Sequence, residues 1–526
     1  MAGTGKTHTV DTLANMWCAV TGKASALAVF CPTGAAAGAA RGVTIDSGLG
    51  VQRSKRQPAP VPEGERLSVL QEEQADTHCA VFDEGWVNGA MLLGHASAAA
   101  KQLTHEGAQE GDSDCWGEQL DSVVLVGDPK QLPPVKDKLA FADGATGTAL
   151  GDSGVLAYRA FTAAHFLDEP VRQDHGEFFD ALTRVRQGFA ADDYEFWSAR
   201  NAKHMPEAVQ KDFQTGRDTL FATCFNRDKE ELNSQYVVGQ QDVCVVKSVA
   251  VGMHALGGNA AAAGAPGSIP LVGYYAFDMM VKLTLNLDPA HGLFNGARGN
   301  VVHVLYESGA YARAGAGPTA AMPVVIVDFP GYTGEPWFDG ADRRTWVPVA
   351  PQERCCERCK SCSRRGVPLA TAKADSVHCC QGISIGAGQA TRRVCGLWDV
   401  KAESQWPGIF YVLASRVQDV EDIAFWCAGV SKEALARIGK GQVWVATDAE
   451  VRRLRQVAQK TAHNRKQPAA TLGQRSTGRS CARRCWRVRA STLLATWCPR
   501  TGVPWRQWSP RGRSRRMSMR QSLSDQ

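Results

Sequence analysis

The chain opens with Ala2-Gly-Thr-Gly-Lys-Thr7, a short glycine-rich segment that constrains its fold more than any other feature. Glycines let a backbone curl until its N–H groups point at phosphate oxygens. The following lysine also contacts phosphate, and the next hydroxyl binds magnesium. The segment matches the last two thirds of a phosphate-binding loop, although so short a string also arises as a chance turn. We expect an α/β fold with a helix starting near Lys6, and we expect the strand that feeds the loop to be missing, as in a chain truncated at its N-terminus.

Two short apolar runs end in acidic residues, as buried parallel strands with polar carboxyl ends do. The first is Cys79-Ala-Val-Phe, followed by Asp83 and Glu84, and the second is Ser122-Val-Val-Leu-Val-Gly, followed by Asp128. Asp83 is placed to hold magnesium directly or through water, and Glu84 to orient and deprotonate an attacking water. Taken singly, acids at a strand end are more often a helix N-cap. Beside the phosphate loop, they favour an NTPase.

The segment Leu125-Val-Gly-Asp-Pro-Lys-Gln-Leu-Pro-Pro-Val135 adds an uncharged amide, Gln131, a few residues after a strand end. An amide at this place can sense a γ-phosphate, and the two prolines rigidify the chain that follows. A P-loop kinase or GTPase shares the loop and the acidic strand but has no use for this segment.

Strand and helix signals alternate along most of the chain, which predicts a doubly wound α/β core. Between Asn300 and Val367 short strands broken by glycine and proline predict a small inserted β-barrel, and an Ala/Gly-rich piece from Val251 to Gly267 is expected to be a flexible insertion. The predicted divisions are a first α/β domain (1–160), the two parts of a second (161–299 and 368–445), the inserted β subdomain (300–367), and a linker with a disordered basic tail (446–526).

Composition limits the compartment more than the partner. There is no run of 18 apolar residues, so no membrane-spanning helix is expected. The net charge of +6 comes from the arginine-rich end after Arg465, because the rest of the chain has more acids than bases. Bulk charge therefore says nothing about what the body binds. The 17 cysteines are scattered, which favours a reducing, intracellular compartment.

Five further segments follow in a fixed order. They are Cys31-Pro-Thr-Gly-Ala-Ala-Ala37 with Gly42-Val-Thr-Ile-Asp-Ser47, Glu169-Pro-Val-Arg-Gln-Asp174, Gly292-Leu-Phe-Asn-Gly-Ala-Arg-Gly299, Ser376-Val-His-Cys-Cys-Gln-Gly382 and Tyr411-Val-Leu-Ala-Ser-Arg-Val417. With the phosphate loop, the acidic strand and the Gln131 segment, they resemble the motifs of the Pif/RecD-like superfamily-1B DNA helicases, and within them the petite-integration-frequency helicases. The resemblance runs from Ala2 to about Ile423.

This resemblance implies two RecA-like P-loop NTPase domains with an inserted SH3-like β-barrel, and ATP and Mg²⁺ bound between the two domains. It implies an ATP-dependent DNA helicase that moves 5′ to 3′ on single-stranded DNA or forked duplex DNA, in DNA repair, recombination or telomere maintenance. RNA as the track stays open, since both nucleic acids offer phosphates and base faces. We expect no membrane association and favour a monomer and a nuclear location, with the mitochondrion or another organelle as alternatives.

The residues and the resemblance together assign the site. The residues expected to contact the nucleotide are Gly3, Thr4, Gly5, Lys6 and Thr7, and those expected to bind magnesium are Thr7 and Asp83. The predicted catalytic residues are Glu84, Gln131, Arg172 and Arg416. The predicted contacts to single-stranded DNA are Pro32, Thr33, Thr44, His378 and Gln381. The two arginines are expected to close on the γ-phosphate, where charge spreads over the oxygens in the transition state.

Three positions depart from the family pattern. Asp46 stands where the family has histidine, Gly85-Trp-Val follows the two acids, and Cys379 replaces a lysine. Together with the expected loss of the first strand, these departures support an alternative: a nucleic-acid-binding fragment that no longer hydrolyses ATP.

Two other signals have competing interpretations. The spacing of Cys355, Cys356, Cys359 and Cys362 suits a zinc ion, but free thiols on a loop are more common. The basic tail suits a sequence-independent nucleic-acid arm or a nuclear localisation signal, and equally a solvated segment without function.

Overall fold

The computed structural model describes residues 2–51, 63–103, 115–117, 120–142, 144–251, 269–306, 322–355, 363–389, 391–426 and 430–466. The predicted insertion after Val251, three of the four clustered cysteines and the basic tail lie outside these residues. None of the helices in the described part of the chain has the length and apolar character needed to span a bilayer.

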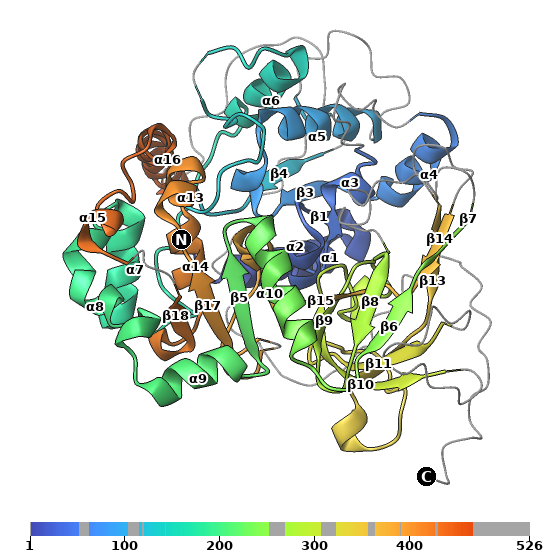
Figure 1. Ribbon diagram of the computed structural model, residues 1–526. Coiled ribbons are helices and arrows are strands. Elements are labelled where there is room, and N and C mark those ends of the chain that lie inside the picture. Colours follow the sequence, from blue (N-terminus) through green and yellow to red (C-terminus); the bar gives the residue numbers. More distant parts are fainter. Residues whose placement is uncertain are drawn as a thin grey trace, which may run out of the picture. The chain divides into compact units, whose positions relative to one another are not determined.

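The first sheet is parallel, as the apolar runs predict, with strand order β2-β1-β3-β4. Figure 1 labels β1, β3 and β4 of this sheet. Its strands are β1 (Leu27–Cys31), β2 (Val43–Thr44), β3 (Cys79–Phe82) and β4 (Ser122–Leu125). Its helices are α1 (Lys6–Thr21), α2 (Gly34–Ala39), α3 (Ile45–Gly48), α4 (Gly64–Gln74), α5 (Ala90–Leu103) and α6 (Ala149–Arg159). All four residues of β3 are buried, so the strand delivers Asp83 and Glu84 to the edge of the sheet where α1 begins. We call this sheet and its helices the first module.

The second sheet is also parallel, with order β16-β5-β17-β18. Its strands are β5 (Thr219–Thr223), β16 (Ala374–Ser376), β17 (Arg393–Leu397) and β18 (Ile423–Phe425). Its helices are α7 (Glu177–Gln187), α8 (Tyr194–Ser198), α9 (Glu207–Thr215), α10 (Asn226–Val238), α13 (Val400–Gln405), α14 (Ile409–Ala414), α15 (Lys432–Leu435) and α16 (Gln442–Lys466). This sheet and its helices form the second module.

Helix α14 organises the core of the second module. Its six residues are apolar on every side and fully buried, so it is a core helix rather than an amphipathic one. Phe410 stacks on Phe425 with ring centroids 4.8 Å apart, and Trp197 packs edge-on against Phe410 at 5.1 Å. Such packing fixes the direction in which Tyr411 leaves the helix, and with it the segment that ends in Arg416.

Between α10 and β16 the chain forms an antiparallel body. Its main sheet has the order β12-β11-β10-β9-β15, and smaller sheets pair β6 with β8 and β13 with β14 and β7. The strands are β6 (Cys244–Lys247), β7 (Val249–Val251), β8 (Val272–Tyr275), β9 (Met280–Leu283), β10 (Arg298–Leu305), β11 (Val324–Asp328), β12 (Trp346–Val349), β13 (Gln352–Cys355), β14 (Ser363–Gly366) and β15 (Leu369–Thr371). The antiparallel strands thus extend beyond the predicted range 300–367 at both ends, because β9 pairs with both β10 and β15.

Residues 446–466, predicted as part of a linker, instead form most of α16. The helix is held by polar contacts to the first module: Tyr158 Oη donates to the buried Glu450 Oε1 at 2.6 Å, and the buried Lys130 Nζ pairs with the partly exposed Asp448 Oδ1 at 2.5 Å. Near its start, Trp444 packs in the core of the second module. Helix α16 therefore contacts both modules.

Helices α5 and α6 pack closely because glycine stands at their crossing. A Cβ on Gly154 would lie 1.8 Å from Ala90 O and 2.7 Å from Gly94 N, a distance no side chain tolerates. We expect Gly154→Val to lower the free energy of unfolding by about 2–3 kcal/mol, since the helices must separate. Urea unfolding measures this, with Ser153→Val on the exposed face of α6 as the control. Equal stability of the two variants would contradict the packing described here.

Candidate active site

The phosphate loop has the backbone that its glycines predict. Gly3 and Gly5 adopt left-handed conformations with φ of 71° and 79°, and α1 begins directly afterwards at Lys6. A Cβ on Gly3 would lie 2.8 Å from Gln173 Oε1, so only glycine fits there without displacing a neighbour. A curled loop at the start of a sixteen-residue helix suits the phosphates of a nucleotide.

The predicted segment 169–174 supports this loop from the other side. The backbone N–H groups of Val171 and Arg172 both donate to Gly3 O, at 2.7 and 3.0 Å. Gln173 is buried and donates from Nε2 to Val417 O at 2.8 Å. Gln173 therefore connects the loop to the segment that follows α14, a role that sequence reasoning missed.

Lys6 faces the acids at the ends of β3 and β4. Burial lowers the pKa of its ammonium group, and the carboxylates of Asp128 and Glu84 oppose that shift. Burial and the neighbouring charge of Glu84 raise the pKa of Asp83 to about 6. Asp83 Oδ1 accepts a hydrogen bond from Glu84 N at 2.8 Å.

Thr7 and Asp83 offer one hydroxyl and one carboxylate, which suits Mg²⁺ better than a metal ion that is held by protein ligands alone. Within the described residues no group of three or more His, Cys, Asp or Glu side chains is placed to hold a metal ion. Magnesium is commonly held by one or two carboxylates while substrate phosphates and water complete its shell. Of the proposed zinc ligands, Cys355 is exposed at the end of β13 and the other three lie outside the described residues.

Glu84 lies in a buried cluster with three other side chains. Its backbone has a φ of 49°, unusual for a residue with a side chain. With the Gln131 amide oriented to satisfy both ends, its nitrogen donates to Glu84 Oε2 at 3.3 Å and its oxygen accepts from Arg416 Nη2 at 3.2 Å. Gln381 Nε2 donates to the same Glu84 oxygen at 3.4 Å. Three of the predicted catalytic residues thus meet, and Gln381, predicted as a DNA contact, lies with them.

The two predicted arginines lie at the same place. Arg416 is 2% exposed, and its Nε has no hydrogen-bond partner among the described residues. Arg172 donates to Ser415 O at 2.7 Å and to Ser384 Oγ at 3.0 Å. Burial, and then the charge of Arg416, lower the pKa of Arg172 to about 9. Two guanidinium groups whose charges repel each other attract an anion, and the Nε–H of Arg416 is a donor for it.

Asp128 is a contact hub that sequence reasoning marked only as a strand end. Its buried carboxylate accepts from Tyr411 Oη at 2.9 Å and pairs with Arg186 Nη2 at 3.3 Å. The Tyr411 hydroxyl in turn accepts from Ala2 N at 3.1 Å, beside the phosphate loop. Burial acts to raise the pKa of Asp128, but the cations of Arg186 and Lys6 outweigh it and hold the pKa well below its usual range.

The predicted DNA contacts of the first module are helix caps. Thr33 Oγ1 accepts from Ala36 N and Thr44 Oγ1 from Ser47 N, both at 3.2 Å, so these threonines start α2 and α3. Pro32 precedes Thr33 and is partly exposed. The caps explain why threonine suits both positions whether or not nucleic acid is bound.

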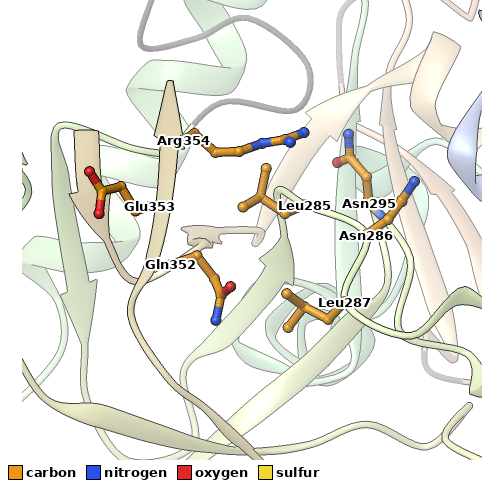
Figure 2. Close-up of a pocket in the computed structure, with 7 residues that line it drawn as sticks. All are labelled: Leu285, Asn286, Leu287, Asn295, Gln352, Glu353 and Arg354. Carbon is orange, nitrogen blue, oxygen red and sulfur yellow. The ribbon is translucent and has the colours of Figure 1, made fainter. Parts of the chain in front are cut away.

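The segment around α2 touches two loops of the rest of the chain. A Cβ on Gly382 would lie 3.5 Å from Ala36, and one on Gly34 would lie 3.0 Å from Asn295 O. Beside Asn295 lies a cavity of about 240 Å³ in the antiparallel body (Figure 2). Figure 2 shows the residues that line it, which are Leu285, Asn286, Leu287, Asn295, Gln352, Glu353 and Arg354.

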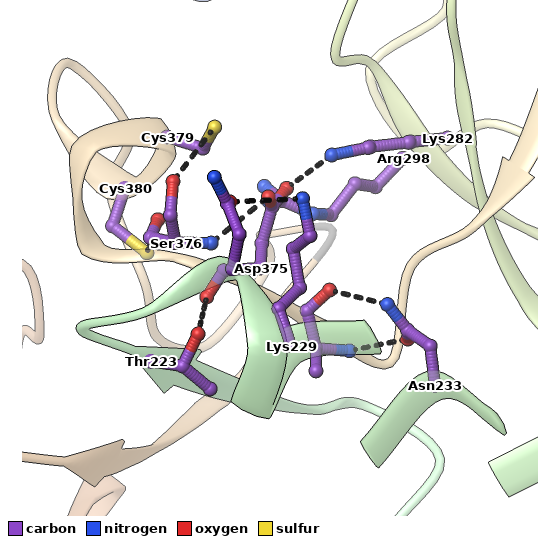
Figure 3. A network of polar contacts seen from close by, with 11 residues as sticks. Thr223, Lys229, Asn233, Lys282, Arg298, Asp375, Ser376, Cys379 and Cys380 are labelled. Carbon is purple, nitrogen blue, oxygen red and sulfur yellow. Dashed lines mark hydrogen bonds and ion pairs between the residues drawn. The ribbon is translucent and has the colours of Figure 1, made fainter. Parts of the chain in front are cut away.

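The loop that carries His378 and Gln381 is anchored by a buried ion cluster (Figure 3). Asp375 Oδ2 pairs with Lys282 Nζ at 2.6 Å and with Arg298 Nη2 at 2.7 Å. Asp375 Oδ1 accepts from Ser376 N at 3.0 Å. The cluster therefore joins β9 and β10 of the antiparallel body to β16 of the second sheet. Arg298 was noticed in the sequence only as part of the Gly292–Gly299 motif.

Comparisons with family models and with curated proteins each found no match. Solved structures do match. The Pif1 helicase from Candida albicans gives a TM-score of 0.60 at 20% identity, covering 86% of this chain and 93% of that chain. Bacteroides Pif1 bound to ssDNA gives 0.56 at 18% identity, covering 82% and 88%. Bacteroides Pif1 in complex with ADP-AlF3 and ssDNA gives 0.54 at 18% identity, covering 81% and 86%.

Two parallel sheets and a phosphate loop define the chain as an α/β protein with two RecA-like modules, which confirms the predicted fold class. More particularly, its fold is that of the Pif1 helicases.

The ion cluster at Asp375 gives a test of the site's framework. Burial acts to raise the Asp375 pKa, but Lys282 and Arg298 outweigh it and hold the pKa well below its usual range. A depressed pKa means that the carboxylate stabilises the fold above about pH 4, and that this contribution is lost as the pH falls through the folded-state pKa. We expect Asp375→Asn to lower the free energy of unfolding at pH 7 by about 3 kcal/mol, since two cations lose their partner.

Denaturant unfolding at pH 7 and at acidic pH checks this, with the exposed Asp339→Asn as the control. The difference in the free energy of unfolding between the wild type and Asp375→Asn should become smaller as the pH falls. A difference that stays constant, or one no larger than the control's, would show that the cluster does not stabilise the fold.

Proposed function

We propose that the chain is an ATP-dependent DNA helicase that moves along single-stranded DNA. The observation that carries the proposal is the meeting of Glu84 and Gln131 from the first module with Arg416 from the second. Hydrolysis of a nucleoside triphosphate needs a water-orienting carboxylate and cations that neutralise the transferring group, and here they come from different modules. Opening and closing between modules can then move two nucleic-acid grips relative to each other.

ATP with Mg²⁺ would supply the phosphoryl group whose hydrolysis drives movement. The backbone of Gly3, Thr4 and Gly5 and the ammonium of Lys6 bind the phosphates, while Thr7 and Asp83 hold the ion. These are the residues at the start of α1 and the end of β3.

The remaining groups act on the hydrolysis step itself. Glu84 orients and deprotonates the water, and Gln131, between Glu84 and Arg416, senses the γ-phosphate. Arg172 and Arg416 stabilise the charge that develops on the transferring group, because both are cations beside the loop and Arg416 is buried.

The neighbouring folds support DNA as the track, since two of them were solved with single-stranded DNA. In this chain the nucleic acid would contact Pro32, Thr33, Thr44 and His378, with little sequence preference. We propose 5′-to-3′ movement, forked duplex DNA as a further substrate, and a monomer in repair, recombination or telomere maintenance, with a nuclear location favoured. The resemblance in sequence motifs is the support for polarity and process.

The test is magnesium-dependent ATP hydrolysis, measured with and without a single-stranded oligonucleotide. We expect a rate that rises with DNA in the wild type and falls about 100-fold or more in Lys6→Ala, because the variant loses a preorganised cation at the phosphates. Lys211→Ala, an exposed lysine on α9, is the matched control and should keep the wild-type rate. Hydrolysis no faster in the wild type than in Lys6→Ala would favour the alternative of a nucleic-acid-binding fragment.

A further inference from the structure

We propose that Gln381 is a positioning residue for hydrolysis, through which nucleic acid bound at residues 376–382 (the 376–382 loop) controls Glu84. The inference rests on the proposed function and names its regulation. The sequence motif assigns Gln381 to DNA, yet the residue is only 8% exposed and its amide lies against the carboxylate of Glu84.

The hydrogen bond from Gln381 to Glu84 fixes which carboxylate oxygen of Glu84 faces the attacking water. Gln381 Nε2 and the Gln131 amide both donate to Oε2, at 3.4 and 3.3 Å. Within the described residues Oε1 accepts no hydrogen bond, so it is the oxygen left for a water proton. The Glu84 backbone is already held at a φ of 49°, so the direction of its carboxylate depends on these side-chain donors. A general base must lie within hydrogen-bond reach of the proton it takes, which makes this direction matter.

The 376–382 loop is fixed at its start. The buried carboxylate of Asp375 holds Lys282, Arg298 and the N–H of Ser376 (Figure 3). From there a 3-10 turn, Val377–Cys380, leads directly to Gln381, whose N–H donates to His378 O at 3.3 Å. Because the turn is short and its first residue is anchored, its backbone has little freedom to deform. A displacement of His378 or Cys379 therefore also moves Gln381.

The two faces of this turn meet different partners. Cys379 is exposed, and His378 is half-buried with its ring 5.9 Å from that of Trp406. Gly382 abuts α2, the helix that Thr33 caps. Nucleic acid that contacts His378 or the start of α2 therefore presses on the outer face of a turn whose next residue points at Glu84. Gln381 on the inner face is the physical link between the track and the hydrolysis step.

The test separates a DNA contact from a positioning residue. The variants are Gln381→Leu, which removes the donor and keeps the volume, and Gln381→Glu, which keeps the length but turns the donor into a repelling carboxylate. Gln389→Leu, an exposed glutamine a few residues further on, is the matched control. Affinity for a fluorescein-labelled oligo(dT) is measured by anisotropy without nucleotide, and kcat and KM for ATP at saturating oligo(dT).

We expect both Gln381 variants to bind oligo(dT) within about twofold of wild type and to keep their KM for ATP, while kcat falls about 10- to 100-fold, as a displaced reacting group predicts. His378→Ala should weaken oligo(dT) binding but lower kcat at saturating DNA less than the Gln381 variants do, because DNA still contacts the start of α2 and Gln381 still contacts Glu84. Unfolding midpoints identify a variant that fails to fold. If one Gln381 variant fails to fold, the kcat and the oligo(dT) affinity of the other Gln381 variant test the proposal.

The proposal is overturned if Gln381→Leu and Gln381→Glu weaken oligo(dT) binding tenfold or more while kcat at saturating DNA is unchanged, since Gln381 is then a DNA contact. It is also overturned if neither quantity changes. A wild-type chain that binds oligo(dT) but hydrolyses no ATP overturns the proposed function as well, and that result is recognised before any variant is compared.

Discussion

The buried carboxylate of Asp128 is the contact on which the rest of the site depends. An unpaired carboxylate inside a protein costs several kcal/mol, so its partners are obligatory. Here they are Arg186 of α7, Tyr411 of α14 and the N–H of Lys130, with the charge of Lys6 nearby. Two of the partners belong to the second module, so one carboxylate at the end of β4 joins the modules at the phosphate loop.

Around this hub the balance of charge favours an anion. The cations Lys6, Arg172 and Arg416 gather near the loop, and partial burial acts to lower the pKa of the first two. A triphosphate would place its negative charge among these three cations. The same cations favour binding of the triphosphate and stabilise the transition state of hydrolysis, in which negative charge moves onto the transferring group.

Much of the fold is predictable because its signals are local. The apolar run before Asp83 is the fully buried strand β3, and the run before Asp128 forms its parallel neighbour β4, which is only partly buried. The antiparallel strands before residue 300 escaped prediction because their pairing is non-local: β9 gains its partners only from β10 and β15. Helix α16 escaped because contacts to Lys130 and Tyr158, rather than an apolar stripe, hold it.

In the candidate site, too, local motifs are predictable from the sequence, whereas contacts between distant segments are not. Motif spacing singles out Gln131 and Arg416, but the contacts of Gln131 with Glu84 and with Arg416 exist only in three dimensions. The place of Gln381 at Glu84, and the link from Ala2 through Tyr411 to Asp128, join residues from distant parts of the chain. A buried tyrosine hydroxyl or glutamine amide chooses its partner by packing, which no local pattern records.

The most direct test of this account is the affinity of a fluorescent ATP analogue, with Mg²⁺, for Tyr411→Phe. The change removes one hydroxyl that serves both Ala2 N and Asp128, so the account predicts a Kd raised about tenfold, the effect of leaving buried polar groups unpaired. Tyr275→Phe removes an equally buried hydroxyl, bonded to Leu369 O in the antiparallel body, and should leave the Kd unchanged. A Tyr411→Phe chain that binds the analogue as tightly as the Tyr275→Phe chain would contradict the claim that the second module supports the nucleotide site.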